Sequence, residues 1–145
     1  MKAMRNSLVL LAIATLAGCS SSINTSPPSY ISDLVTYGEG HEAFACYFVL
    51  KDSSGAETAS DGRYTLRVED DSGVIFTQTR TISAEWFQKA TVGQGAFERE
   101  RLLYYIGRIT YSEFRRDPEG YIGTVSVEFV VDGKTLRGED TLFFD

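Results

Sequence analysis

The sequence predicts an all-β fold, an antiparallel sandwich or barrel of about seven to eight strands. Residues with high strand propensity are frequent, including eight Tyr and nine Phe among 145 residues. Short apolar or alternating segments are separated by turn sequences such as Ser53-Ser54-Gly55. Near the C-terminus, two strand-like segments flank Asp132-Gly133, a dipeptide strongly preferred in two-residue hairpin turns.

The first strands are predicted from apolar patterning. Residues 43–51 are almost all apolar, which is typical of a central strand that is buried on both faces. Residues 63–69 alternate between polar and apolar side chains, as in a strand with one buried face. The turn sequence at residues 70–73 would return the chain into residues 74–82, so these two segments should form a hairpin.

The middle of the chain is less regular. Residues 83–87 are predicted to form a short helical turn with Ser83 as its N-cap. Residues 91–96 hold Gly93 and Gly95 and are expected to form a loop. Residues 99–115 would then carry one long strand or two strands, broken near Gly107.

The last hairpin has a definite predicted register. When residues 121–131 pair with residues 135–144, Phe129 faces Leu136 and Glu128 faces Arg137 across the strands. The same register places Asp140 on the apolar face. A β-bulge at Gly138 is expected to turn this carboxylate outward.

The first eighteen residues have the parts of an export signal in order. Lys2 and Arg5 precede an apolar run at residues 8–14, which is too short for a membrane-spanning helix of about 20 residues. The run ends in Leu16-Ala17-Gly18-Cys19, which resembles the lipobox of prokaryotic lipoproteins. The resemblance implies a signal peptide at residues 1–18, cleavage before Cys19, and lipid on that thiol. An ordinary signal peptide followed by a chance cysteine is the alternative.

Lipid on Cys19 would hold the mature chain on a membrane of the cell envelope. The lipobox resemblance also implies that Ser20, at the position after the cysteine, favours the outer membrane if the source is Gram-negative. Residues 20–29 are Ser-rich and end in Pro27-Pro28 and Ser29, so residues 19–29 are expected to form a tether. Residues 30–145 would then form a single β domain.

Two segments resemble parts of immunoglobulin-like domains. Asp117-Pro118-Glu119-Gly120-Tyr121 resembles their Asp-x-Gly-x-Tyr corner, and residues 61–73 are similar to strand–turn units of immunoglobulin-like and fibronectin-III-like domains in prokaryotic surface proteins. The resemblance covers about residues 42–144 and implies an immunoglobulin-like antiparallel β-sandwich. No cysteine pair bridges the sheets here. Cys46 has no partner once Cys19 is lipidated, and its apolar neighbours predict a buried thiol.

Charge and residue types narrow the function classes. Removal of residues 1–18 would change the net charge from −6 to −8, and an acidic domain is a poor partner for nucleic acid. The one histidine, His41, is expected to be solvated. No cluster has the spacing of metal ligands, and the acidic turn at residues 69–71 lacks the spaced ligands of a calcium loop. We therefore expect no catalytic residues, metal or cofactor.

The best candidate binding surface lies within residues 99–116, which hold five arginines and three tyrosines. Arg and Tyr often dominate the energetics of interfaces. Alternation predicts Tyr104 in the core and an exposed set of Tyr105, Arg108 and Tyr111. Alternatively, these arginines only pair with glutamates across strands. The expected function is a non-catalytic structural or protein-binding module on the envelope membrane. A glycan-binding module that uses surface Tyr and Trp86 is the alternative.

Overall fold

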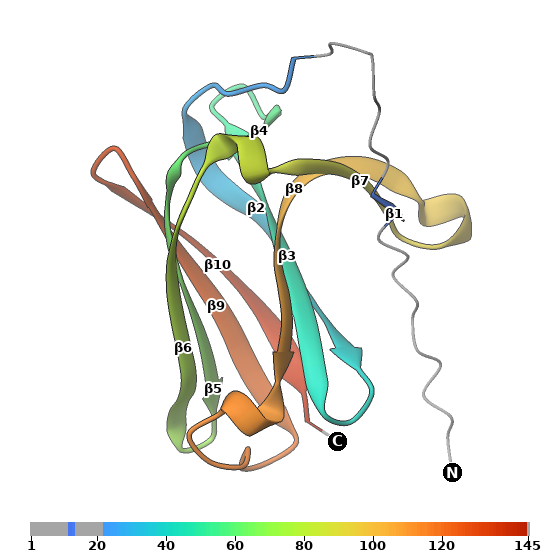
Figure 1. Cartoon of the computed structure of the whole chain (residues 1–145), viewed down its shortest axis with the longest axis vertical. Coiled ribbons are helices and arrows are strands. Elements are labelled where there is room, and N and C mark those ends of the chain that lie inside the picture. Colours follow the sequence, from blue (N-terminus) through green and yellow to red (C-terminus); the bar gives the residue numbers. More distant parts are fainter. Residues whose placement is uncertain (1–11, 14–21, 145) are drawn as a thin grey trace.

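The computed structural model describes residues 12–13 and 22–144, and it is an all-β antiparallel sandwich of the immunoglobulin-like class (Figure 1). The rest of the predicted leader, Cys19 and the first residues of the predicted tether lie outside the described residues. The described chain forms ten strands, of which two have only two residues, so the predicted number of seven to eight strands is confirmed.

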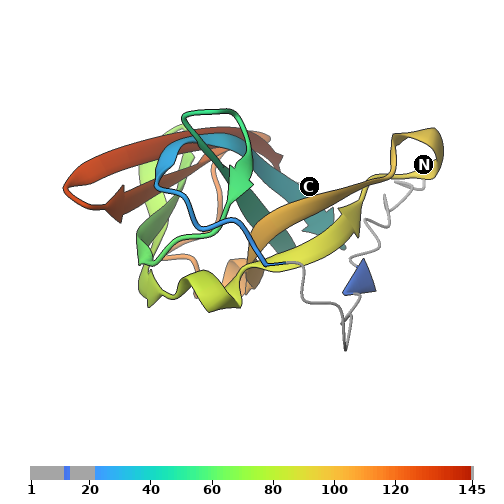
Figure 2. The same cartoon turned by 90° about the horizontal axis from the view of Figure 1, so that it is seen from above.

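The strands form two sheets that pack face to face (Figure 2). The first sheet contains, in spatial order, β1 (Ala12–Ile13), β7 (Gln88–Val92), β8 (Arg99–Thr110), β3 (Ala43–Asp52) and β2 (Pro28–Glu39), with β4 (Glu57–Thr58) beside β3. The second sheet contains β10 (Lys134–Phe143), β9 (Ile122–Val131), β5 (Gly62–Asp70) and β6 (Gly73–Ile82). Three short 3₁₀ turns connect strands, namely η1 (Ala84–Trp86), η2 (Gly95–Phe97) and η3 (Tyr111–Glu113). None of these described helical turns has the length or the apolar content that crossing a membrane requires.

Aromatic side chains fill the core between the sheets. The ring of Phe48 on β3 lies 5.5 to 6.1 Å from the rings of Tyr64, Phe87, Tyr104 and Phe129. These contacts join both sheets, and tilted or edge-to-face pairs at such distances stabilise a core beyond the area they bury. The alternation predicted for residues 63–69 is confirmed, because the apolar positions of β5 are fully buried.

Strand β3 is buried on both faces, as predicted. Cys46 lies on its inner face, is fully buried and forms no disulfide. Burial, with a smaller contribution from the charge of Asp140, raises the pKa of the Cys46 thiol to about 12. A thiol with this pKa stays protonated near neutral pH and behaves as a small apolar side chain.

The hairpin of β9 and β10 has the predicted register. Leu136 pairs with Phe129 and Arg137 with Glu128, around a turn in which Asp132 and Gly133 have φ of 48° and 75°. Two successive positive φ values are those of a type I′ turn, which explains the preference for Asp-Gly there.

The prediction of a bulge at Gly138 is wrong. The pairing of β10 with β9 runs without a shift from Lys134 to Phe143, so Asp140 keeps its inward direction. Its Oδ2 atom accepts hydrogen bonds from the backbone N–H of Thr36 at 2.7 Å and from the Thr36 hydroxyl at 2.8 Å. Thr36 belongs to β2, so the edge of one sheet lies against the edge of the other and closes one flank of the sandwich.

The segment that follows β6 differs from its prediction in two ways. The helical turn after Ser83 exists, but the Ser83 side chain makes no capping bond, and Asp61 Oδ1 instead accepts from the Ala84 N–H at 2.7 Å. The predicted loop at residues 91–96 begins only at Gly93, because Thr91 and Val92 belong to β7. A five-residue strand that contains polar side chains gives too weak an alternation to be recognised.

Residues 99–110 form one long strand, β8, with a bulge. Cys46 pairs with Gly107 and Tyr47 with Tyr105, so Ile106 is the extra residue. Gly107 has a φ of 113°, which suits glycine at a bulge. The chain then turns through η3 and does not continue as a second strand.

The predicted tether makes ordered contacts with the domain. The backbone N–H of Ala59 donates to the carbonyl of Asn24 at 2.9 Å, and the Thr58 hydroxyl donates to the carbonyl of Ser26 at 2.6 Å. Ile23 packs against the core. These contacts place the start of the folded domain near Ile23, several residues before the predicted boundary at Tyr30.

Candidate binding face

The outer face of the first sheet carries a second apolar cluster. We use "outer face" for the side turned away from the second sheet. Five of its side chains have exposed fractions of 5% or less, and they come from β3, β7 and β8: Tyr47, Val49, Ala90, Val92 and Leu103. Half-buried Val35, Tyr37 and Tyr105 surround them. Among the described residues, no second layer of strands or helices covers this face (Figure 2).

One end of the outer face is bounded by a buried arginine. Arg101 has an exposed fraction of 6%; its Nη2 atom lies 2.6 Å from Asp33 Oδ2, and its Nε atom bonds to Glu57. Burial alone would raise the pKa of Asp33, but hydrogen bonds from Arg101 and Ser32 outweigh burial and leave that pKa below its ordinary value. The buried charge is therefore fully paired and ties β8 to β2 and β4.

The other end is bounded by a pair on the rim. Arg108 Nε lies 3.0 Å from Glu39 Oε2, and both side chains are partly exposed. Between the two ends, Tyr37 and Tyr105 lie against the cluster, and burial, together with a hydrogen bond to Tyr105, raises the pKa of Tyr37. The outer face thus has an apolar centre rich in tyrosine and charged pairs at its margins.

The three predicted binding residues do not share one surface. Tyr105 and Arg108 lie on the outer face as described above. Tyr111 packs against the main core, stacked on Phe114 with ring centroids 5.1 Å apart and edge-on to Phe144 at 6.0 Å. The bulge at Ile106 and the turn of η3 redirect the chain, so alternation along β8 does not extend to residue 111.

Sequence reasoning missed the members of the cluster that lie outside residues 99–116. Tyr37, Tyr47 and Val49 come from β2 and β3, which pair with each other and with β8. The apolar residues at successive positions of segment 43–51 were the signal in the sequence that could have indicated a second apolar face. Since the second sheet packs on only one face of β3, the apolar side chains of the other face belong to the outer cluster, in which Tyr47 and Val49 are still buried.

The edges of the two sheets are closed to different degrees. Strands β2 and β10 lie against each other, and the Ile75 carbonyl on β6 accepts a hydrogen bond from the Arg115 N–H at 2.8 Å. Within the part of the chain that the structure describes, the side of β7 opposite β8 pairs only with the two residues of β1, with Ala12 opposite Thr91 and Ile13 opposite Ala90. Among the described strands, β7 therefore has the edge with the least cover from the folded domain.

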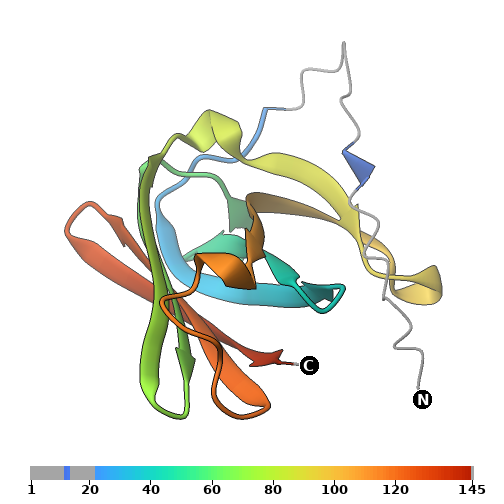
Figure 3. The same cartoon turned by 60° about the horizontal axis from the view of Figure 1, so that its bottom comes forward.

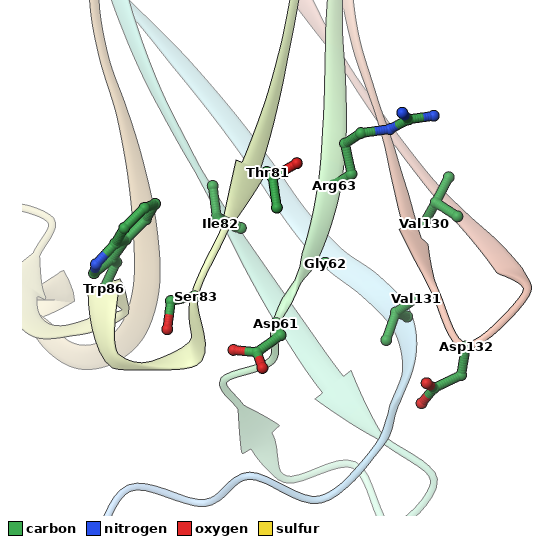
Figure 4. A pocket seen from close by; sticks show the side chains of 10 residues that line it. All are labelled: Asp61, Gly62, Arg63, Thr81, Ile82, Ser83, Trp86, Val130, Val131 and Asp132. Carbon is green, nitrogen blue, oxygen red and sulfur yellow. The ribbon is translucent and has the colours of Figure 1, made fainter.

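An open depression of about 580 Å³ lies at another part of the molecule, between the start of β5, the end of β6 and the β9–β10 turn (Figure 4). Trp86, with an exposed fraction of 52%, lines one side of it, and Arg63 and Val130 line another. The carboxylates of Asp61 and Asp132 lie along its lower rim in Figure 4. An exposed indole with polar groups nearby is a surface on which a sugar ring can stack.

The remaining acidic and polar candidates have structural partners or are exposed. In the turn at residues 69–71, Asp70 accepts two hydrogen bonds from Arg116 at 2.5 and 2.8 Å, which join the β5–β6 turn to the loop after η3 (Figure 3). His41 is exposed. Tyr121 has an exposed fraction of 84%, so it does not pack as the corner tyrosine of immunoglobulin-like domains. Within residues 12–13 and 22–144, no group of three or more His, Cys, Asp or Glu side chains is arranged to hold a metal ion.

Comparison with known proteins identifies no relative of this chain. No family model matches the chain, and neither a curated protein nor a solved structure matches it. The candidate site therefore stands on the chain's own residues: a tyrosine-rich apolar face with paired charges at both ends, beside the edge of β7.

Proposed function

We propose that this chain is an envelope lipoprotein, anchored to a membrane through lipid on Cys19, whose β-sandwich is a non-catalytic protein-binding module. The outer face of the first sheet is its binding surface. The lipobox Leu16-Ala17-Gly18-Cys19 supports the anchor, and Ser20 favours the outer membrane where the source is Gram-negative.

The observation that carries the proposal is the apolar cluster on the outer face. A sandwich needs apolar side chains only on the faces that meet, and the residues on the outside of each strand are normally polar. The second sheet follows this rule over most of its outside, although Ile122, Val130 and Phe143 are exposed there. On its outside the hydroxyls of Thr65 and Thr79 share a hydrogen bond of 3.0 Å, and Arg67 pairs with Glu128 at 3.5 Å. The first sheet breaks the rule.

The composition of the outer face fits a protein partner. Tyrosines are enriched in protein interfaces, and charged residues are depleted from their centres. Here Tyr47 lies within the buried cluster and half-buried Tyr37 and Tyr105 pack against it, while the pairs made by Arg101 and Arg108 lie at the margins. A charged rim around an apolar centre is the usual arrangement in a specific interface.

Site-specific photo-crosslinking in intact cells tests this function. A photoreactive amino acid placed at Tyr105 should give a discrete adduct with an envelope protein. The same probe at Thr79, which is exposed on the outside of the second sheet, is the matched control. Equal adducts at both positions, or adducts at Thr79 alone, would show that the outer face is not the binding surface.

The depression beside Trp86 favours glycan binding as a second candidate function. Trp86 is the only tryptophan of the chain, so its fluorescence reports on that site alone. If the module binds glycans there, cell-wall sugar fragments should change the Trp86 emission in a saturable way. Replacement of Arg63, which also lines the depression, by Ala should then weaken the change in Trp86 emission. An emission that stays constant up to millimolar sugar removes this candidate.

A further inference from the structure

The edge of β7 and the outer face form one continuous surface. Ala90 and Val92 of β7 point to the outer face and belong to its apolar cluster, together with Leu103 on β8. A segment that pairs with β7 would therefore place every second side chain on that face, beside the cluster. Backbone pairing and apolar contact are available to the same occupant.

The chain itself shows what kind of segment fits. The two residues of β1, Ala12 and Ile13, come from the predicted apolar leader and pair antiparallel with β7. In this pairing Ile13 lies opposite Ala90 and Ala12 lies opposite Thr91. An extended, apolar and uncharged stretch is thus accepted at this edge.

Processing would leave the edge of β7 without this partner. This step rests on the proposed function, because cleavage before Cys19 removes residues 1–18, which include Ala12 and Ile13. An unpaired edge strand beside buried apolar side chains is a template for pairing with another chain. The other edges offer less, since β2 and β10 face each other, and β6, which Arg115 meets only at Ile75, carries exposed Thr77 and Thr79 where β7 carries apolar side chains.

We propose that, in the mature protein, β7 and the outer face bind an extended apolar peptide segment of a partner protein, which adds to the first sheet as an antiparallel strand beside Ala90 and Thr91. Main-chain hydrogen bonds to β7 supply affinity, and the tyrosine-rich cluster selects apolar side chains at alternate positions of the bound segment.

A peptide-binding experiment on the mature lipoprotein in nanodiscs tests this inference. The probe is a synthetic peptide with the sequence of residues 8–17, flanked by lysines for solubility and labelled with a fluorophore. Empty nanodiscs measure partition into lipid. The matched control peptide carries N-methyl groups on alternate backbone amides, which keeps its apolar character but removes its capacity to donate to β7.

The labelled peptide should bind, and it should slow hydrogen exchange in residues 88–92. The control peptide, whose N-methyl groups replace the amide hydrogens that would face β7, should bind at least about tenfold more weakly. It cannot donate these backbone hydrogen bonds to β7. Equal binding of both peptides, or binding with no protection of residues 88–92, overturns the inference. Concentration-dependent dimers with protection of residues 88–92 in the absence of peptide also overturn it, because a second copy would then be the occupant.

A separate measurement keeps this inference distinct from the proposed function. The intact mass of the protein recovered from membranes reports whether residues 1–18 have been removed and lipid added. A mass that retains the leader overturns the proposed anchor. A processed mass without peptide binding overturns only the strand-addition inference.

Discussion

At the scale of single residues, the buried side chains of Cys46 and Arg101 differ in whether they need a polar partner. Cys46 is an apolar contact on the inner face of β3 and needs no polar partner. Arg101 carries a charge at a buried position and depends on Asp33 and Glu57. Removal of the first leaves a small cavity, whereas removal of the second leaves carboxylates without their cation.

For Cys46, we expect Cys46→Ala to be mild, with a loss of about 1 kcal/mol, and Cys46→Asp to unfold the domain, because a charge at this position has no partner. Denaturant unfolding followed by circular dichroism measures both effects. The native thiol should resist modification until the protein unfolds, as its raised pKa and burial require. Rapid modification of the native protein would contradict the burial of Cys46.

For Arg101, replacement by Ala should lower the free energy of unfolding by about 2 kcal/mol, less than for a fully buried pair because Asp33 and Glu57 are partly exposed. The matched control is Arg108→Ala, which removes the exposed partner of Glu39 and should cost less than about 1 kcal/mol. Equal losses in the two variants would show that burial of Arg101 adds nothing to stability.

At the scale of elements, the contact between β2 and β10 could not be predicted from the local sequence patterns of either strand. Gly138 on β10 lies against β2, and a Cβ atom there would be 2.8 Å from Ile31 Cγ2 and 3.4 Å from Leu34 Cβ. The glycine therefore allows close approach of two strands and is not a bulge residue. Asp140 completes the contact through its bonds to Thr36.

A double-mutant cycle tests this close approach. Gly138→Ala should destabilise the domain by about 1–3 kcal/mol, because the added methyl group overlaps a β-branched side chain that cannot move aside freely. In the Ile31→Ala background the same substitution should cost much less, because the overlapping Cγ2 atom is gone. Thermal unfolding of the four proteins measures the coupling, and additive effects would rule out the contact.

At the scale of the whole molecule, two carboxylates hold loops to the sandwich. Hydrogen bonds from the Ser54 and Asn24 side chains lower the pKa of Asp52 to about 2. A hydrogen bond from Arg116 holds the pKa of Asp70 well below its ordinary range. Asp52 thus connects the N-terminal segment to the β3–β4 turn, and Asp70 connects the β5–β6 turn to the loop after η3 (Figure 3).

Stability should therefore fall in acid. Because the folded chain has lower carboxyl pKa values than the unfolded chain, with its Asp pKa of about 3.9, the stabilisation is complete above that value and is lost as pH falls toward about 2. Melting temperatures measured from pH 7 to pH 2 should drop mainly below pH 4. The variant Asp70→Asn should show a smaller drop in that range, and an unchanged pH profile would remove Asp70 as a contributor.

The proposed membrane anchor is also tested at this scale. Cys19→Ser should give an uncut precursor without lipid, because the peptidase of lipoproteins acts after lipid attachment, as the lipobox resemblance implies. Metabolic labelling with a fatty acid measures this, with the wild-type chain as the positive control. Label that persists in the Cys19→Ser variant would place the lipid elsewhere.

The sequence by itself determined the all-β class, the buried strand β3, the β5–β6 hairpin and the register of β9 with β10. These features depend on alternation and turn residues that act within a few positions, as Asp132 and Gly133 do in their turn. The burial of Cys46 followed from its apolar neighbours for the same reason. The short edge strand β7 had too few residues for such a signal.

Only the tertiary structure decided which surfaces meet. The inward direction of Asp140, the burial of Arg101 and the separation of Tyr111 from Tyr105 each depend on strands that are far apart in the sequence. The apolar outer face has the same origin, because its residues come from four strands and become one surface only when β2, β3, β8 and β7 pair in register. The alternation of polar and apolar residues predicts which side chains share a face of a strand, but the packing of the two sheets decides whether that face is covered.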